Sequence, residues 1–140
     1  MEKTMTVCPH CSALNNVVTQ KALNKTATCG KCGHTLKMHS LVSEVSGNDM
    51  QRIISKATKP VIVDFWASWC GPCQMYGPEF EKASKENPNA IFLKVNTESD
   101  PQIGQKLGIR GIPATLVFKG GKEVKRQAGA MSSQQVASLI

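Results

Sequence analysis

All six cysteines of this 140-residue chain come in pairs with two residues between the members. The pairs are Cys8 with Cys11, Cys29 with Cys32, and Cys70 with Cys73. Such a spacing brings two sulfur atoms to one turn, where they can bind a metal ion as thiolates or exchange electrons as a dithiol and disulfide. The residues around each pair indicate which chemistry to expect.

The first two pairs have the spacing of a metal site, C-x2-C-x17-C-x2-C. Each turn points two thiolates at one centre, and two turns complete a tetrahedron. Gly30 and Gly33 can adopt the positive φ angles that such turns demand, and Pro9 stiffens the first turn. We therefore predict one structural zinc ion. Its ligands would be Cys8, Cys11, Cys29 and Cys32. Two disulfides or four free thiols are the alternatives.

The other residues of this segment favour no second ligand. His10 and His34 flank the cysteines, but four cysteines already fill a tetrahedral shell, so we expect both histidines at the surface. No pair is followed directly by histidine, which argues against covalent haem. The segment is rich in lysine, yet residues 1–64 contain no Phe, Tyr or Trp on which bases could stack. Nucleic acid is therefore not an expected partner.

Composition also predicts two domains. All seven aromatic residues lie between Phe65 and Phe118. Residues 1–40 carry too few apolar side chains for a core and need the metal as a staple. We predict a zinc ribbon over 1–40 and a second domain over 41–140 that folds on a core of its own.

Strand and helix patterns alternate in the second domain. Strands are expected at 41–45, 60–67 and 90–96, with a hairpin at 115–127 around Gly120 and Gly121. Helices are expected at 46–57, from Cys70 to about Glu86, at 99–108 and at 132–140. Ser46, Asn48 or Asp49 would cap the first helix. This order predicts an α/β fold, a mixed sheet with helices on both faces.

The third cysteine pair lies where a strand ends and a helix begins. At a helix N-terminus, unsatisfied N–H groups and the helix dipole favour a thiolate on Cys70, and the thiolate is the attacking species in disulfide exchange. Cys73 lies one turn further and can close a disulfide, while Pro72 suits an early helical position. This pattern predicts a redox-active dithiol. Half of a metal site is the alternative, but no unpaired couple remains to complete it.

Asp64 interrupts the apolar strand just before this pair. A buried carboxyl has a raised pKa and could accept the proton of Cys73. The alternative is a carboxylate turned outward at the strand end.

Three segments resemble thioredoxin over about residues 41–140. They are VDFWASWCGPC, GIRGIPATLVFKGG and AGAMS. The added segment with four cysteines resembles the zinc-containing second thioredoxin of bacteria, so the likeness covers nearly the whole chain. It implies a thioredoxin fold preceded by a small zinc ribbon.

The resemblance also implies roles for matching residues. Cys70 would attack a substrate disulfide and Cys73 would resolve the intermediate, with Asp64 as the buried carboxylate and Lys94 as its partner. The residues expected to bind substrate are Trp69, Gly71, Pro72, Ile112, Pro113 and Gly129, with Pro113 in cis. Gln74 and Ala114 depart from the family, where Lys or Arg and Thr are common.

The activity implied is reduction of protein disulfides. Client proteins and an NADPH-dependent flavin thioredoxin reductase would be the partners, with no bound flavin, nicotinamide or haem. We expect a cytoplasmic monomer without membrane contact, because the N-terminus lacks an apolar signal segment and no apolar run could span a bilayer. A formal charge of +7 suits acidic partners without identifying one. A disulfide oxidase or isomerase and a zinc-based redox sensor are the alternatives.

Overall fold

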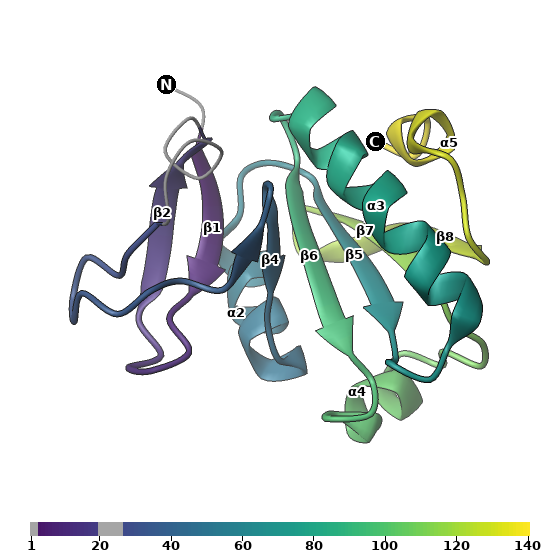
Figure 1. Ribbon diagram of the computed structural model, residues 1–140, viewed down its shortest axis with the longest axis horizontal. Helices are drawn as coiled ribbons and strands as arrows, with labels where there is room; N and C mark the ends of the chain where they lie inside the picture. The colour runs from purple at the N-terminus through teal and green to yellow at the C-terminus, as the bar shows by residue number, and fades with distance from the viewer. Residues whose placement is uncertain (1–2, 20–26) are drawn as a thin grey trace.

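Two sheets of unequal size lie side by side in the computed structural model, which describes residues 3–19 and 27–140 (Figure 1). The small sheet is an antiparallel hairpin of β1 (Lys3–Val7) and β2 (Leu14–Val18). The large sheet has six strands in the order β3-β4-β6-β5-β7-β8. The hairpin belongs to the predicted ribbon.

The large sheet is mixed, as the sequence predicts. Its strands are β3 (Met38–His39), β4 (Val42–Glu44), β5 (Val61–Trp66), β6 (Ile91–Asn96), β7 (Ala114–Lys119) and β8 (Lys122–Ala128). The three central strands β4, β6 and β5 are parallel, whereas β3, β7 and β8 pair antiparallel with their neighbours. Gly120 and Gly121 both have positive φ in the turn between β7 and β8, which a two-residue hairpin turn requires.

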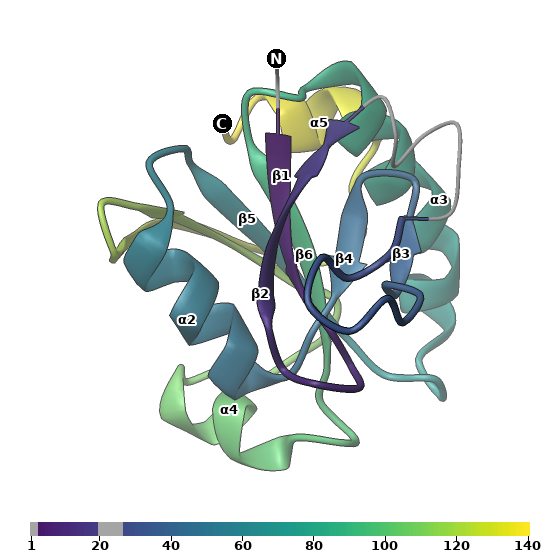
Figure 2. The ribbon, with the colours of Figure 1, turned by 90° about the vertical axis from the view of Figure 1, so that its left-hand side faces the viewer.

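Four described helices cover the two faces of this sheet. They are α2 (Gly47–Lys56), α3 (Gly71–Glu86), α4 (Pro101–Lys106) and α5 (Ser133–Ala137). Figure 2 shows α2 and α4 on one side and α3 and α5 on the other. Ser46 is the N-cap of α2, since its hydroxyl accepts a hydrogen bond from the backbone N–H of Asp49. Of the three candidate caps, only Ser46 precedes the first helical residue.

Each face of the sheet has its own apolar cluster. Beneath α3 and α5, Tyr76, Phe80 and Val136 pack on Phe92 and neighbouring strand residues. Beneath α2 and α4, Met50, Ile53 and Ile103 pack on side chains of β5, β6 and β7. Both clusters are nearly free of solvent, so burial of apolar surface on both faces stabilises the sheet.

The hairpin shares the second of these clusters. Met5 and Val7 of β1 are 8% and 4% exposed and belong to the cluster beneath α2. The hydroxyl of Ser43 in β4 donates to the carbonyl oxygen of Met5 over 3.1 Å. The cluster beneath α2 therefore contains side chains from both predicted domains. Alternation along β1 turns two apolar side chains toward the large sheet, and the core extends into the first forty residues.

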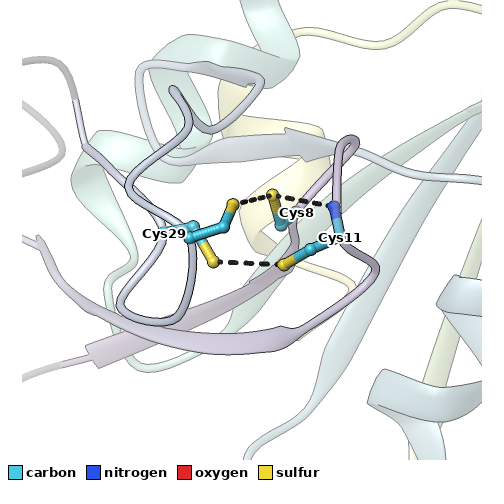
Figure 3. A group of neighbouring side chains, drawn as sticks. Cys8, Cys11 and Cys29 are labelled. Atoms are coloured by element: carbon cyan, nitrogen blue, oxygen red, sulfur yellow. Dashed lines mark hydrogen bonds between the residues drawn. The ribbon is translucent and has the colours of Figure 1, made fainter.

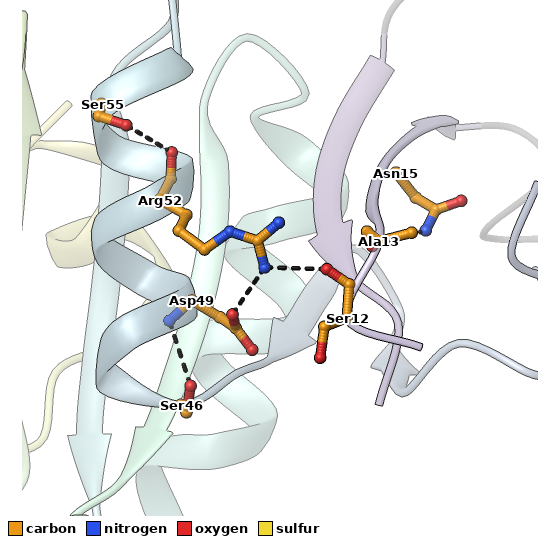
Figure 4. A network of polar contacts seen from close by, with 7 residues as sticks. All are labelled: Ser12, Ala13, Asn15, Ser46, Asp49, Arg52 and Ser55. Atoms are coloured by element: carbon orange, nitrogen blue, oxygen red, sulfur yellow. Dashed lines mark hydrogen bonds and ion pairs between the residues drawn. The ribbon is translucent and has the colours of Figure 1, made fainter. Parts of the chain in front are cut away.

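Polar contacts join the hairpin to α2, as Figure 4 shows, and to the loop that follows this helix. The guanidinium of Arg52 donates to the carbonyl oxygen of Ser12 and to the carboxylate of Asp49, each over 2.9 Å. The amine of Lys59 donates to the carbonyl oxygen of Lys3 over 2.6 Å. Because these groups are exposed, each contributes little free energy. Their effect is on orientation, which keeps the turn after β1 beside the helix.

Candidate active site and metal site

The third cysteine pair forms a disulfide at the start of α3. Cys70 is the N-cap of this helix, and its Sγ accepts a hydrogen bond from the backbone N–H of Cys73 over 3.2 Å. The two side chains are 3% and 5% exposed. The N-terminus of α3 therefore lies at Cys70 Sγ, where it would stabilise negative charge.

A loop from the other side of the sheet meets this pair. The Ile112–Pro113 peptide bond is cis, as the resemblance implies. The carbonyl oxygen of Ile112 lies 3.6 Å from Cys70 Sγ. Gly129 donates its N–H to the carbonyl oxygen of Pro113 over 2.8 Å with φ at +91°, a conformation that favours glycine. The segment of Ile112 and Pro113 thus meets Cys70, and Gly129 holds that segment from behind through its bond to Pro113.

The residues next to Cys70 form the exposed part of this site. Trp69 is 72% exposed, and Gly71 and Pro72 are exposed as well. An exposed indole beside a buried disulfide gives an apolar surface next to Cys70.

Asp64 is buried in β5, which excludes the outward-turned alternative. It is 3% exposed, and its Oδ1 has no hydrogen-bond partner among the described residues. Burial raises the pKa of Asp64 to about 7, against a smaller lowering effect of the positive charge on Lys94. A carboxyl group with this pKa can both take up and release a proton near neutral pH.

Lys94 lies beside Asp64 in register but makes its contacts elsewhere. The two residues are partners across the parallel strands β5 and β6. The amine of Lys94 forms an ion pair with Glu44 at 3.7 Å and lies 4.5 Å from the ring centroid of Trp66. Its effect on Asp64 acts through space.

Glu98 and Gln74 both bind Ser68, in the loop before Trp69, and sequence reasoning predicted neither contact. The hydroxyl of Ser68 donates to Glu98 over 2.6 Å, and this bond, with one from the Ser68 backbone, lowers the pKa of Glu98. The amide of Gln74 donates to the carbonyl oxygen of Ser68 over 3.1 Å. The sequence marks Gln74 only as a missing cation. A polar residue just past β6 was the available signal for Glu98, because β5 and β6 end at the same edge.

The other four cysteines converge at the turn of the hairpin (Figure 3). Their sulfur atoms all lie within 4.8 Å of one another, and the Cys8–Cys32 and Cys11–Cys29 sulfur pairs are 3.6 Å apart. Sulfur atoms bound to one zinc ion at about 2.3 Å would be about 3.8 Å apart. The four residues are thus positioned to hold a metal ion, and the geometry fits zinc.

Backbone and side-chain N–H groups surround these sulfur atoms. The backbone N–H groups of His10 and Lys31 point at Cys8 and Cys29 over 3.4 Å each. The side chain of Asn15 donates to Cys29 over 3.5 Å, and this bond is the largest of several that lower the pKa of Cys29 to about 6. Such donors favour thiolates, the form in which cysteine binds a metal.

The two cysteine turns have related backbones. Gly33, after the second pair, has φ at +78°, as predicted, and Ser12 takes the corresponding place after the first pair at +64°. Gly30 has no positive φ; its N–H instead donates to the side-chain oxygen of Asn15 over 3.0 Å. The prediction for Gly30 is therefore wrong, because the positive angle falls after the second cysteine of each turn.

His10 and His34 are exposed, as expected, and stack on each other. Their ring centroids are 4.9 Å apart with the planes 16° from parallel. The two stacked rings lie at the surface and link the turn of Cys8 and Cys11 with the turn of Cys29 and Cys32. Neither histidine takes the place of a cysteine as a metal ligand.

Comparison with known proteins identifies the family. A sequence model of thioredoxin matches residues 41–140. The chain belongs to the thioredoxin family. Thioredoxin C-3 of Corynebacterium nephridii is 34% identical over 134 residues, which cover 96% of this chain and 91% of that protein. Thioredoxin of Chlorobaculum thiosulfatiphilum is 42% identical over 98 residues, covering 69% and 91%. Putative thioredoxin 2 of Streptomyces coelicolor is 41% identical over 80 residues, covering 57% and 60%.

This thioredoxin is a thiol–disulfide oxidoreductase with protein-disulfide reductase activity, as its family membership implies. Its fold is the thioredoxin fold with a small hairpin and four close cysteines in front. Within residues 3–19 and 27–140, the helices are all too short or too polar to cross a bilayer.

The buried carboxyl should make stability depend on pH. The pKa of Asp64 is raised from its unfolded value of about 4 to about 7 in the folded protein. Its contribution to stability is therefore present below about pH 4 and is lost as pH rises toward 7, by at most about 1.4 kcal/mol per unit. Asp64→Asn should remove this loss. In urea denaturation of the oxidised protein, the variant should gain about 2–3 kcal/mol on the wild type between roughly pH 5 and pH 8.

The matched control is Glu86→Gln, the same chemical change at an exposed residue that ends α3. It should follow the wild type at both pH values. Parallel pH dependence of Asp64→Asn and the wild type would contradict a raised pKa in the folded state.

Proposed function

We propose that this thioredoxin reduces disulfides of client proteins through Cys70 and Cys73, and that its four N-terminal cysteines hold one structural zinc ion. The observation that carries the proposal is Cys70 Sγ at the N-terminus of α3, facing the carbonyl oxygen of Ile112. One sulfur is thus next to the exposed indole of Trp69, while the other lies a turn further along the helix.

The proposed cycle needs two sulfur exchanges. In the reduced protein, the thiolate of Cys70 attacks a substrate disulfide, forms a mixed disulfide and releases the first substrate thiol. The thiol of Cys73 loses its proton, attacks Cys70 Sγ and releases the second substrate thiol. The Cys70–Cys73 disulfide remains, so two electrons have passed to the substrate.

Asp64 is the proposed acceptor of the Cys73 proton. It is buried on the sheet face that α3 covers, and its raised pKa makes it a stronger base than an ordinary carboxylate. Lys94 is its proposed partner, as the neighbour in register on β6.

Six residues are proposed to bind the substrate chain around Cys70. They are Trp69, Gly71, Pro72, Ile112, Pro113 and Gly129. The carbonyl oxygen of Ile112 lies next to Cys70 Sγ, and an extended substrate segment could pair with this backbone. Gly129, bonded to Pro113, leaves room beside that backbone because it has no side chain.

An NADPH-dependent flavin thioredoxin reductase is the proposed source of electrons, with neither flavin nor nicotinamide bound by this chain. We propose a cytoplasmic monomer. The proposed domains are a zinc ribbon over 1–40 and a thioredoxin domain over 41–140. The zinc ion would hold the two cysteine turns together, and a site with four protein ligands leaves no open position for catalysis.

The activity is tested by reduction of insulin with NADPH and thioredoxin reductase. Cys70→Ser should abolish it, since only Cys70 has the helix N-terminus at its sulfur. Cys73→Ser should still attack but fail to resolve, leaving mixed disulfides that survive electrophoresis without reductant. If Cys73 instead trapped substrate in Cys70→Ser, the two roles would be reversed. A wild type that oxidises reduced substrates but takes no electrons from the reductase would favour the oxidase alternative.

The metal is tested by elemental analysis of the purified protein. We expect about one zinc per chain, lost in Cys29→Ser because three ligands remain. Asn15→Ala should weaken zinc binding in a chelator competition, since it removes a donor to Cys29. His10→Ala is the matched control and should bind zinc as the wild type does. Zinc retained in full by Cys29→Ser, or lost in His10→Ala, would contradict the proposed ligand set.

A further inference from the structure

A row of polar side chains crosses the large sheet on the face that α3 covers. Adjacent strands pair Glu44 with Lys94, Lys94 with Asp64, and Asp64 with Thr115. Neighbouring strands are about 4.8 Å apart, so Glu44 and Asp64 are separated by about twice that distance with Lys94 between them. The row runs from β4 to β7 and includes the buried carboxyl of Asp64.

Glu44 is the anionic centre of the outer part of this row. Its carboxylate contacts the amine of Lys37 and lies 3.7 Å from the amine of Lys94 and 3.9 Å from the imidazole of His39. Its side chain is 18% exposed, so solvent screens these contacts only in part.

Lys94 has two contacts that draw its amine toward Glu44 and away from Asp64. One is the ion pair with Glu44, and the other is the ring of Trp66, 4.5 Å from the amine. Trp66 and Asp64 both lie on β5, two residues apart and on the same face. The amine could reach Asp64 if Glu44 did not hold it, because the lysine stem is long and flexible.

We infer that Glu44 is a positioning residue of the redox site, which holds the amine of Lys94 away from Asp64 and so keeps Asp64 able to carry a proton near neutral pH. The inference rests on the proposed role of Asp64 as proton acceptor for Cys73. Without Glu44, Lys94 would turn toward the buried carboxylate, which would become a weaker base. The proton of Cys73 would then be removed more slowly at neutral pH.

The other groups around Asp64 allow a clean measurement. Tyr76 on α3 stays neutral because burial raises its pKa, and its hydroxyl bonds to Thr115 over 2.8 Å. Cys73 does not titrate while it is in the disulfide. In the oxidised protein, the charges that face Asp64 are therefore Lys94 and, behind it, Glu44 with Lys37 and His39.

Lys37 brings the predicted ribbon into this network. It lies five residues after Cys32, its amine contacts Glu44, and its carbonyl oxygen accepts the backbone N–H of Glu44 over 3.2 Å. Lys37→Gln should leave Glu44 with Lys94 as its main cation and shift the titration of Asp64 in the opposite sense to Glu44→Gln. The shift should be small, because the Lys37 side chain is 56% exposed.

The test is a titration of the Asp64 carboxyl carbon by NMR in the oxidised, zinc-loaded protein. All variants carry His39→Gln, so that protonation of His39 does not enter. Glu44→Gln should lower the midpoint of Asp64 by about one pH unit, and Lys94→Gln should raise it. In the Lys94→Gln background, Glu44→Gln should shift the midpoint by less than half as much. Glu123→Gln, which removes an exposed carboxylate on β8, should shift nothing.

Either of two results overturns the inference. One is an Asp64 midpoint that Glu44→Gln leaves unchanged. The other is a shift as large without Lys94 as with it, which would mean direct repulsion between the carboxylates. The rate at which Cys73 resolves a mixed disulfide supplies the second readout. Glu44→Gln should slow resolution near neutral pH. If Asp64→Asn left that rate unchanged, Asp64 would not be the proton acceptor of Cys73. The titration would still test separately whether Glu44 changes the pKa of Asp64.

Discussion

A carboxyl group buried in the central sheet is the constraint around which this thioredoxin is built. Ionised Asp64 would be costly in the apolar surroundings that leave it 3% exposed. The folded protein accommodates it by raising its pKa to about 7, so that it is neutral or ionised with almost equal ease. A pKa near 7 suits the proposed role of Asp64 as proton acceptor for Cys73, and in the inference above it depends on where the amine of Lys94 is held.

Helix α3 and the strands next to Asp64 have different effects on the site. The N-terminus of α3 favours negative charge on Cys70, the proposed attacking residue, whereas Cys73 lies further into the helix. In the proposed cycle, Cys73 keeps its proton until Asp64 accepts it. Lys94 is near enough to lower the pKa of Asp64 but is engaged by Glu44 and Trp66. In the proposed mechanism, the sheet supplies the base Asp64, and Glu44 limits how far Lys94 stabilises its ionised form.

Much of this could be predicted from the sequence because the signals are local. Paired cysteines, a serine before an apolar helix and two glycines between strands each act within a few residues. The burial of Asp64 could also be predicted, since its strand is apolar on both sides. The Glu44–Lys94 contact could not, because it depends on β4 and β6 being neighbours although fifty residues separate Glu44 from Lys94. The packing of Met5 and Val7 beneath α2 could not be predicted for the same reason. Alternation in β1 indicates which side chains share a face of the strand, but not which part of the protein that face packs against.

The most direct test of the account is the pH dependence of resolution in Asp64→Asn. Rapid mixing of the reduced protein with a chromophoric aromatic disulfide releases one thiol when Cys70 attacks and a second when Cys73 resolves. We expect the second step of the variant to be slower by roughly tenfold or more near neutral pH. The gap should close as pH rises and hydroxide removes the Cys73 proton directly. Identical pH–rate profiles for the second step in variant and wild type would contradict the central role given to the buried carboxyl.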